Sequence, residues 1–178
     1  MTLPNLLLIA GTGNKSGKTT IVCRITESFP DLRITAIKIT PHFHETTAGL
    51  IVFAYSDGYS IYEETNTESG KDTSRMLRSG AAKVYFAKVW DDKLYEAFSK
   101  IMEIIPEGMP VICESPALRN FVEPGAFIIM TSENTYNKKY IKHLQILPHL
   151  MIKLEELDNI TTLPIGFEDG KWFLKSKV

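Results

Sequence analysis

The apolar segment 6–10 runs directly into a glycine-rich turn, which ends in Gly17-Lys18-Thr19. Glycine reaches backbone conformations that place successive N–H groups on one concave face. An amphipathic segment follows at 20–29, and a helix that begins near Lys18 would point the positive end of its dipole at the same face. The chain is therefore restricted to folds in which a buried strand leads into a helix across an anion-binding turn.

The spacing of this turn is close to the phosphate-binding pattern G-x-x-x-x-G-K-[ST], and it differs at the first position, where Thr12 stands between Gly11 and Gly13. We therefore expect a polyphosphate at the turn, with Lys18 spanning the β- and γ-phosphates and the Thr19 hydroxyl as a Mg²⁺ ligand. A glycine-rich turn without a ligand is the alternative, but such a turn does not need Lys-Thr at this place. The candidate phosphate-binding residues are Gly13, Asn14, Lys15, Ser16, Gly17, Lys18, Thr19 and Thr20.

Composition favours one domain that spans 1–178, since 178 residues, of which 44% are hydrophobic and 23% charged, are too few for two well-buried cores. A formal net charge of −1 gives no general attraction to nucleic acid or to an anionic membrane surface. The apolar stretches are far shorter than the roughly 18 residues of a spanning helix, so we expect a cytoplasmic protein. Cys23 and Cys113 have no zinc-type spacing and are interpreted as buried thiols.

Apolar runs rich in β-branched residues alternate with segments of helical period, which predicts an α/β fold. Such an order favours a mostly parallel sheet that is covered on both faces and binds its ligand at the carboxyl ends of the strands. The expected strands are 6–10, 34–39, 83–89, 111–113 and 126–130, and the expected helices are 18–29, 72–79, 92–105 and 137–147.

Two segments depart from this order and read as β-hairpins. The first, 50–62, turns at Asp57-Gly58, and the second, 163–174, turns at Asp169-Gly170. We expect both hairpins to form antiparallel edges of the sheet.

A carboxylate at the end of a neighbouring apolar strand would supply the second protein ligand that triphosphate-bound Mg²⁺ needs, and Glu114 is in such a place. An unpaired buried carboxylate is costly, so Glu114 should contact a metal, a metal-held water or an arginine; a solvated strand end is the alternative. Lys18 and Glu114 are the candidate catalytic residues. Arg119 could pair with Glu114 or contact a phosphate, and the sequence leaves both open.

Lys38 ends the second expected strand and is followed by His42 and His44. A His-x-His pair could hold a transition metal, but no third ligand has suitable spacing, so polar lining of a substrate pocket is the preferred interpretation. Further along, Lys71, Asp72 and Arg75 crowd a loop and the first turn of a helix. Cations at a helix N-terminus oppose its dipole, which favours contacts with an anionic ligand over a solvated helix start.

The order of these segments resembles the order of motifs in the MobB family, the molybdopterin-guanine dinucleotide biosynthesis protein B group. The likeness covers roughly 5–132 and lies in the turn at 13–20, the strand end at 38–44, the loop at 70–75 with 78–82, and the strand that ends at Glu114. It implies a P-loop NTPase three-layer sandwich, GTP binding with Mg²⁺, a homodimer, and a molybdopterin nucleotidyltransferase as partner. The resemblance places Gly17, Lys18 and Thr19 at the phosphates, Lys38, His42, Asp72 and Arg75 around the ligand, and Glu114 at the metal. The family's Glu is typically followed by glycine, where Ser115 and Pro116 stand here.

Three functions therefore remain open. The first is a slow NTP hydrolase or nucleotide-binding adaptor in molybdenum cofactor assembly. The second is a small-molecule kinase or ATP-dependent ligase, in which 42–44 and 71–75 line the substrate site. The third is a non-catalytic interaction domain that retains phosphate binding. GTP and ATP also remain open, because 137–139 reads Asn-Lys-Lys and is followed by Tyr140 instead of the Asp that would accept hydrogen bonds from guanine.

Overall fold

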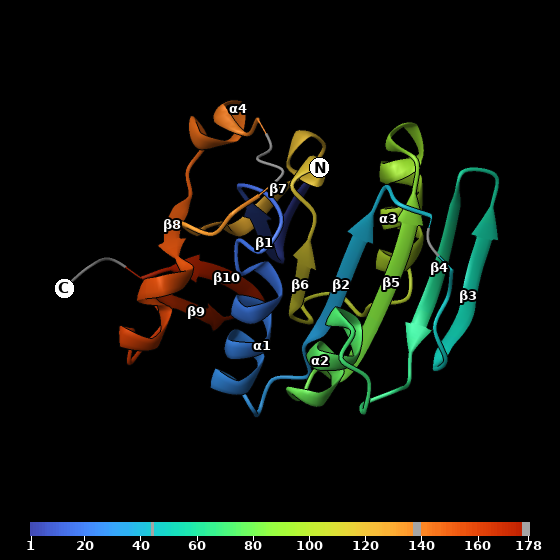
Figure 1. The fold of residues 1–178 in the computed structure, drawn as a ribbon, viewed down its shortest axis with the longest axis horizontal. Coiled ribbons are helices and arrows are strands. Elements are labelled where there is room, and N and C mark those ends of the chain that lie inside the picture. The colour runs from blue at the N-terminus through green and yellow to red at the C-terminus, as the bar shows by residue number, and fades with distance from the viewer. Residues whose placement is uncertain (44, 137–139, 176–178) are drawn as a thin grey trace.

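The chain forms an α/β fold around one eight-stranded sheet, as its order of apolar runs predicts (Figure 1). The structure is a computed structural model and describes residues 1–43, 45–136 and 140–175. The strands of the sheet are β1 (Thr2–Gly11), β2 (Thr35–Thr40), β3 (Leu50–Ser56), β4 (Tyr59–Glu64), β5 (Lys83–Val89), β6 (Val111–Glu114), β7 (Glu123–Thr131) and β8 (Leu150–Lys153). Their order across the sheet is β3-β4-β5-β2-β6-β1-β7-β8.

The sheet is mostly parallel. The block β5-β2-β6-β1-β7-β8 is parallel throughout, and the hairpin β3-β4 adds to β5 in antiparallel pairing. Gly58 has a φ of 85° in the turn of this hairpin, so a residue that tolerates the left-handed region is needed there. The first predicted hairpin is thus confirmed as a sheet edge.

Helices cover both faces of the sheet and make three layers. The helices are α1 (Lys18–Ser28), α2 (Asp72–Arg78), α3 (Leu94–Met102) and α4 (Lys142–Gln145), with short 3₁₀ turns η1 (Asp91–Lys93), η2 (Ala117–Asn120) and η3 (Leu154–Asn159). Alternate residues of the central strands point to opposite faces, so Leu8 packs in the core with α3 and α4, whereas Leu7 and Ile9 pack with α1 and α2. Both faces of β1 are therefore buried.

The second predicted hairpin exists but does not lie where the sequence suggested. Strands β9 (Ile165–Glu168) and β10 (Lys171–Leu174) pair with each other in a separate two-stranded sheet. Trp172, 1% exposed, belongs to the core on the α1 side and packs against Phe29 and Phe167. Burial of this large ring holds the hairpin against a face of the sheet, which corrects the expectation that it would extend an edge.

The remaining differences from the expected elements concern β8, α3 and α4. Strand β8 was not predicted, because the segment 150–153 reads Leu-Met-Ile-Lys and contains only one β-branched residue. The helix expected at 92–105 is observed as α3, preceded by η1, and the helix expected at 137–147 is observed as the short α4, with 137–139 outside the described residues.

No helix in the described ranges is long and apolar enough to cross a membrane. The two cysteines are both thiols outside any disulfide; Cys113 is buried, and Cys23 is only partly buried. Burial raises the pKa of both thiols, most strongly that of Cys113, so neither is an activated thiolate.

Candidate functional site

The carboxyl ends of three parallel strands position the candidate site. In the register of the sheet, Glu114 of β6 lies beside Ile9 of β1 on one side and beside Lys38 of β2 on the other. Two residues earlier in their strands, Ala36 and Ile112 belong to the core under α1 and α2. Because side chains alternate along a strand, Lys38 and Glu114 both point to the face on which α1 and α2 begin.

The loop 11–17 joins β1 to α1 at this edge. Two backbone hydrogen bonds to the segment 130–136 hold the loop in place. Thr12 N donates to Met130 O at 3.1 Å, and Asn14 N donates to Tyr136 O at 2.9 Å. Left-handed conformations occur at Lys15, with φ 56°, and at Gly17, with φ 90°. The second of these immediately precedes α1 and, together with Lys15, curls the loop around the helix N-terminus.

Side chains of the loop and of α1 fold inward over this turn. The ammonium of Lys18 donates to Gly13 O at 2.9 Å and to Ser16 Oγ at 3.3 Å, and Ser16 Oγ donates to Gly13 O at 3.0 Å. The packing is close, because a Cβ at Gly11 would lie 2.1 Å from Ser16 Oγ and 2.8 Å from Lys18 Cγ. Glycine at position 11 thus allows the Lys18 chain to lie across the loop.

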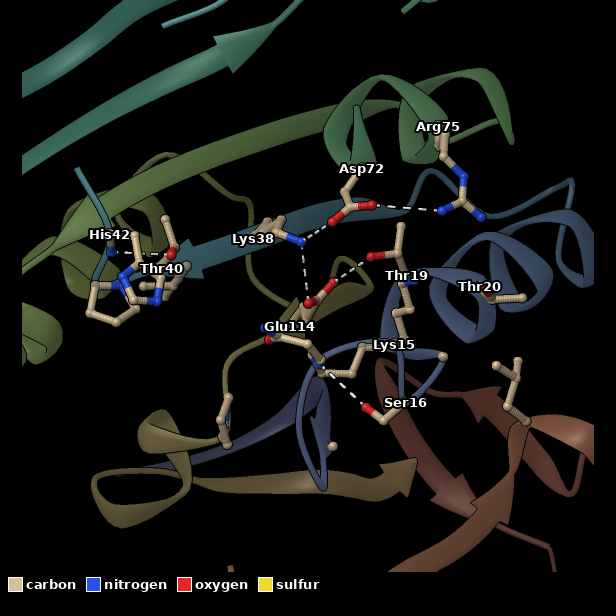
Figure 2. Close-up of a pocket in the computed structure, with 18 residues that line it drawn as sticks. Lys15, Ser16, Thr19, Thr20, Lys38, Thr40, His42, Asp72, Arg75 and Glu114 are labelled. Atoms are coloured by element: carbon tan, nitrogen blue, oxygen red, sulfur yellow. Dashed lines mark hydrogen bonds and ion pairs between the residues drawn. The ribbon is translucent and has the colours of Figure 1, made fainter. Parts of the chain in front are cut away.

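A polar network continues from the first turn of α1 to β6, β2 and α2 (Figure 2). Thr19 Oγ1 donates to Glu114 Oε2 at 2.9 Å. Lys38 Nζ donates to Glu114 Oε1 at 3.3 Å and forms an ion pair with Asp72. Arg75 lies 3.6 Å from the other oxygen of Asp72. The network therefore joins four elements at one edge of the sheet.

Charge pairing dominates the electrostatics of the network. Burial disfavours the charged form of Lys38, but the carboxylates of Glu114 and Asp72 outweigh it and raise the pKa of Lys38. Burial likewise acts to raise the pKa of Asp72, yet the Lys38 ammonium, the Arg75 guanidinium and the Thr19 hydroxyl together outweigh it and lower the pKa. Lys38 and Asp72 are therefore both held in their charged forms.

These side chains line a cavity of about 570 Å³. Of the predicted phosphate-binding residues, 14–20 line it, while Gly13 contributes the carbonyl that Lys18 contacts. From the other predicted positions, the cavity brings together Lys38, His42, Asp72, Arg75 and Glu114. Its charged lining suits an anionic ligand of the size of a nucleotide.

Two predicted residues lie elsewhere. Arg119 donates to Val122 O at 2.9 Å and stacks over the Phe127 ring, so the structure assigns it neither to Glu114 nor to the cavity. Lys71 lines a second cavity of about 190 Å³, which adjoins the first along Lys38 and Asp72. His44 lies outside the described residues.

The cavity also includes residues that the sequence did not single out. These are Leu154, from η3 after β8, and Ile39 and Pro41 around the end of β2. A lone leucine in a segment of weak periodicity carries no signal of ligand contact. Only the parallel pairing of β8 with β7 places Leu154 beside the loop 11–17, where its Cδ1 would lie 2.9 Å from a Cβ at Gly17.

The chain was compared with protein-family models, curated proteins and solved structures. None of them matches it.

Within the described residues, no cluster of three or more His, Cys, Asp and Glu side chains could hold a metal by itself. Mg²⁺ differs from transition metals here, because it commonly takes one or two protein oxygens and completes its octahedron with phosphate oxygens and water. Thr19 Oγ1 and Glu114 Oε2 are two such oxygens, adjacent to each other and on the cavity wall. This pair fits Mg²⁺ only together with a phosphate ligand.

Proposed function

We propose that the chain is a P-loop protein that binds a nucleoside triphosphate together with Mg²⁺. The observation that carries the proposal is the placement of Lys18 and Thr19. Both follow a left-handed glycine at a helix N-terminus, and both line one cavity with Glu114. A helix N-terminus with converging backbone N–H groups and a lysine is suited to phosphate, and an adjacent hydroxyl and carboxylate are suited to its Mg²⁺.

In this proposal, Lys18 exchanges its contact with Gly13 O for the phosphate oxygens, and the N–H groups at the start of α1 bind the same phosphates. Thr19 and Glu114 hold the metal, which when bound would offset charge on the terminal phosphate. Lys38 and Arg75 also line the cavity, where each pairs with Asp72. Slow hydrolysis of GTP or ATP is the reaction that this arrangement supports, with Lys18 and Glu114 as the catalytic candidates.

A role in molybdenum cofactor assembly is a finer proposal. It rests on the order of the motifs that resemble MobB, and the partner would be a molybdopterin nucleotidyltransferase. Binding of this chain to such an enzyme in a pull-down only when GTP and Mg²⁺ are present would support the role. Equal binding without nucleotide would count against it.

A small-molecule kinase or ligase is the second candidate, and one observation favours it. The cavity extends beyond the loop 11–17 to Thr40, Pro41 and His42 and adjoins a second cavity that contains Lys71. This leaves space for an acceptor beside the terminal phosphate. Phosphate release that depends on an added small molecule would identify this class.

Isothermal titration calorimetry with GTP, ATP, GDP and inorganic triphosphate, each with Mg²⁺ and with EDTA, tests the central proposal. We expect saturable binding of a nucleoside triphosphate that strengthens with Mg²⁺. Tighter binding of nucleotide than of inorganic triphosphate would show that the base also contributes. No binding of any of these ligands would contradict the proposal.

A further inference from the structure

Lys38 lies between two carboxylates that reach it from different elements (Figure 2). Asp72 is the first residue of α2, Glu114 is the last residue of β6, and the single ammonium of Lys38 contacts both. The side chain of Glu114 is 6% exposed and that of Lys38 is 19% exposed. The side chain of Asp72 is 41% exposed, so Glu114 is the buried member of the pair of acids. An ammonium carries three donors, so one cation can contact both acids.

The same carboxylate is the metal ligand of the proposed function. Glu114 receives Thr19 on Oε2 and Lys38 on Oε1, so a metal at Thr19 and Glu114 would share this acid with the ammonium. Two cations on one buried carboxylate repel each other strongly, because the low local dielectric screens them little. Additional negative charge is needed to hold both, and a triphosphate brings it.

We propose that Lys38 is a built-in counter-cation that makes divalent-metal binding at Thr19 and Glu114 conditional on a triphosphate. The inference rests on the proposed function for the location of the metal. Without ligand, Lys38 pairs with both acids and keeps the metal out. With a triphosphate bound, the phosphate charge offsets the repulsion, and Asp72 retains Lys38 while Glu114 serves the metal.

A purely structural Lys38 would behave differently when it is removed. If the ammonium only neutralises the buried Glu114 and pairs with Asp72, its loss weakens the fold and creates no metal site. If it competes with a metal, its loss leaves Asp72 with Arg75 alone and Glu114 without its cation. A divalent cation can then bind at Glu114 and Thr19 without nucleotide.

The test is a titration with Mn²⁺, followed by electron paramagnetic resonance, in the absence of nucleotide. Lys38→Met should bind one Mn²⁺ at least about tenfold more tightly than the wild type, because it removes one positive charge from the shared acid. Lys38→Arg keeps the charge and should behave as the wild type. Lys83→Met is the matched control, since Lys83 pairs with Glu63 on the neighbouring strand, outside the cavity, and is 53% exposed.

Combining Lys38→Met with Glu114→Gln should abolish the new Mn²⁺ site, which locates it at Glu114. Equal Mn²⁺ affinity in Lys38→Met and the wild type would overturn the inference, and so would a site that survives Glu114→Gln. These measurements contain no nucleotide. A failure of triphosphate binding would therefore overturn the proposed function without deciding the role of Lys38.

Should Lys38→Met fail to fold, the wild type still decides the question. Its melting temperature should rise when Mg²⁺ and a non-hydrolysable triphosphate are added together, and Mg²⁺ alone should have no effect. Stabilisation by Mg²⁺ alone that equals the combined effect would overturn the inference, because no counter-cation would then be excluding the metal.

Discussion

Thr19 Oγ1 donates a 2.9 Å hydrogen bond to Glu114 Oε2 across 95 positions of the chain. The bond joins the first turn of α1 to the last residue of β6, so the start of the helix and the strand end are held at a fixed separation. Preorganised oxygen donors of this kind reduce the ordering that ligand binding would otherwise require.

Replacing Lys18 with alanine should greatly weaken triphosphate binding while leaving the fold intact. Lys18 lies on the cavity wall, and its ammonium donates to Gly13 O and Ser16 Oγ of the loop. Loss of charge-assisted contacts should cost about 2–3 kcal/mol, or roughly a hundredfold in affinity, measured by calorimetry. Lys100→Ala, which removes a surface pair with Glu103 on α3, is the control. Unchanged affinity in a folded Lys18→Ala variant would refute the assignment.

Glu114→Gln should weaken nucleotide binding and hydrolysis in Mg²⁺ far more than nucleotide binding in EDTA. The amide retains the size of the side chain but loses the charge that a metal requires. Glu63→Gln, which affects a surface pair with Lys83, should change neither measurement. An equal loss with and without Mg²⁺ would indicate that Glu114 only balances Lys38.

Gly11→Ala should lower triphosphate affinity by at least about tenfold, because the new methyl would collide with Ser16 Oγ and the Lys18 side chain and displace both. Gly70→Ala is a matched control, since a Cβ at Gly70 meets nothing within 4 Å. Both variants can be compared by calorimetry and thermal melting. Equal affinity in the two variants would show that the close packing of the loop is not needed for binding.

The lowered pKa of Asp72 makes the free energy of unfolding depend on pH in the acidic range. Its pKa is lowered below the ordinary 3.8 because Lys38, together with Arg75 and Thr19, outweighs the effect of burial, so these contacts stabilise the fold above that pH. The stabilisation is lost as the pH falls through the lowered pKa. Urea denaturation from neutral pH to below 3.8 should therefore show the wild type losing more stability than Asp72→Asn. Parallel pH profiles for the two proteins would contradict this coupling.

Leu8→Ala should destabilise the protein by about 3 kcal/mol, because it opens a cavity in a central strand that lies between β6 and β7. Leu8 is 0% exposed, whereas Tyr55 on the edge strand β3 is 80% exposed. Tyr55→Ala should change the unfolding free energy by only about 0.5 kcal/mol or less. Urea denaturation of both variants measures the contrast, and a small effect at Leu8 would mean that β1 tolerates the void by collapsing around it.

The sequence by itself determined the elements whose formation depends on residues close together in the chain. The strand, turn and helix from 6 to 29 follow from an apolar run, a glycine turn and a helical period, all of which act over a few residues. The hairpin at Asp57-Gly58 follows in the same way from its turn residues. Placement of candidate polar residues at strand ends could also be predicted, because parallel strands bring their carboxyl ends to one edge.

Tertiary structure alone decided which of those residues meet. Lys38 and Glu114 are 76 positions apart, and only the register of β2 against β6 makes them neighbours. Two other features also depend on packing in the folded chain. Arg119 contacts Val122 O and the Phe127 ring, and Trp172 packs in the core on the α1 side. Local propensity contains no information about strand register or about which face a hairpin will cover. These features are selected by burial of apolar surface and by pairing of charges in the assembled sheet.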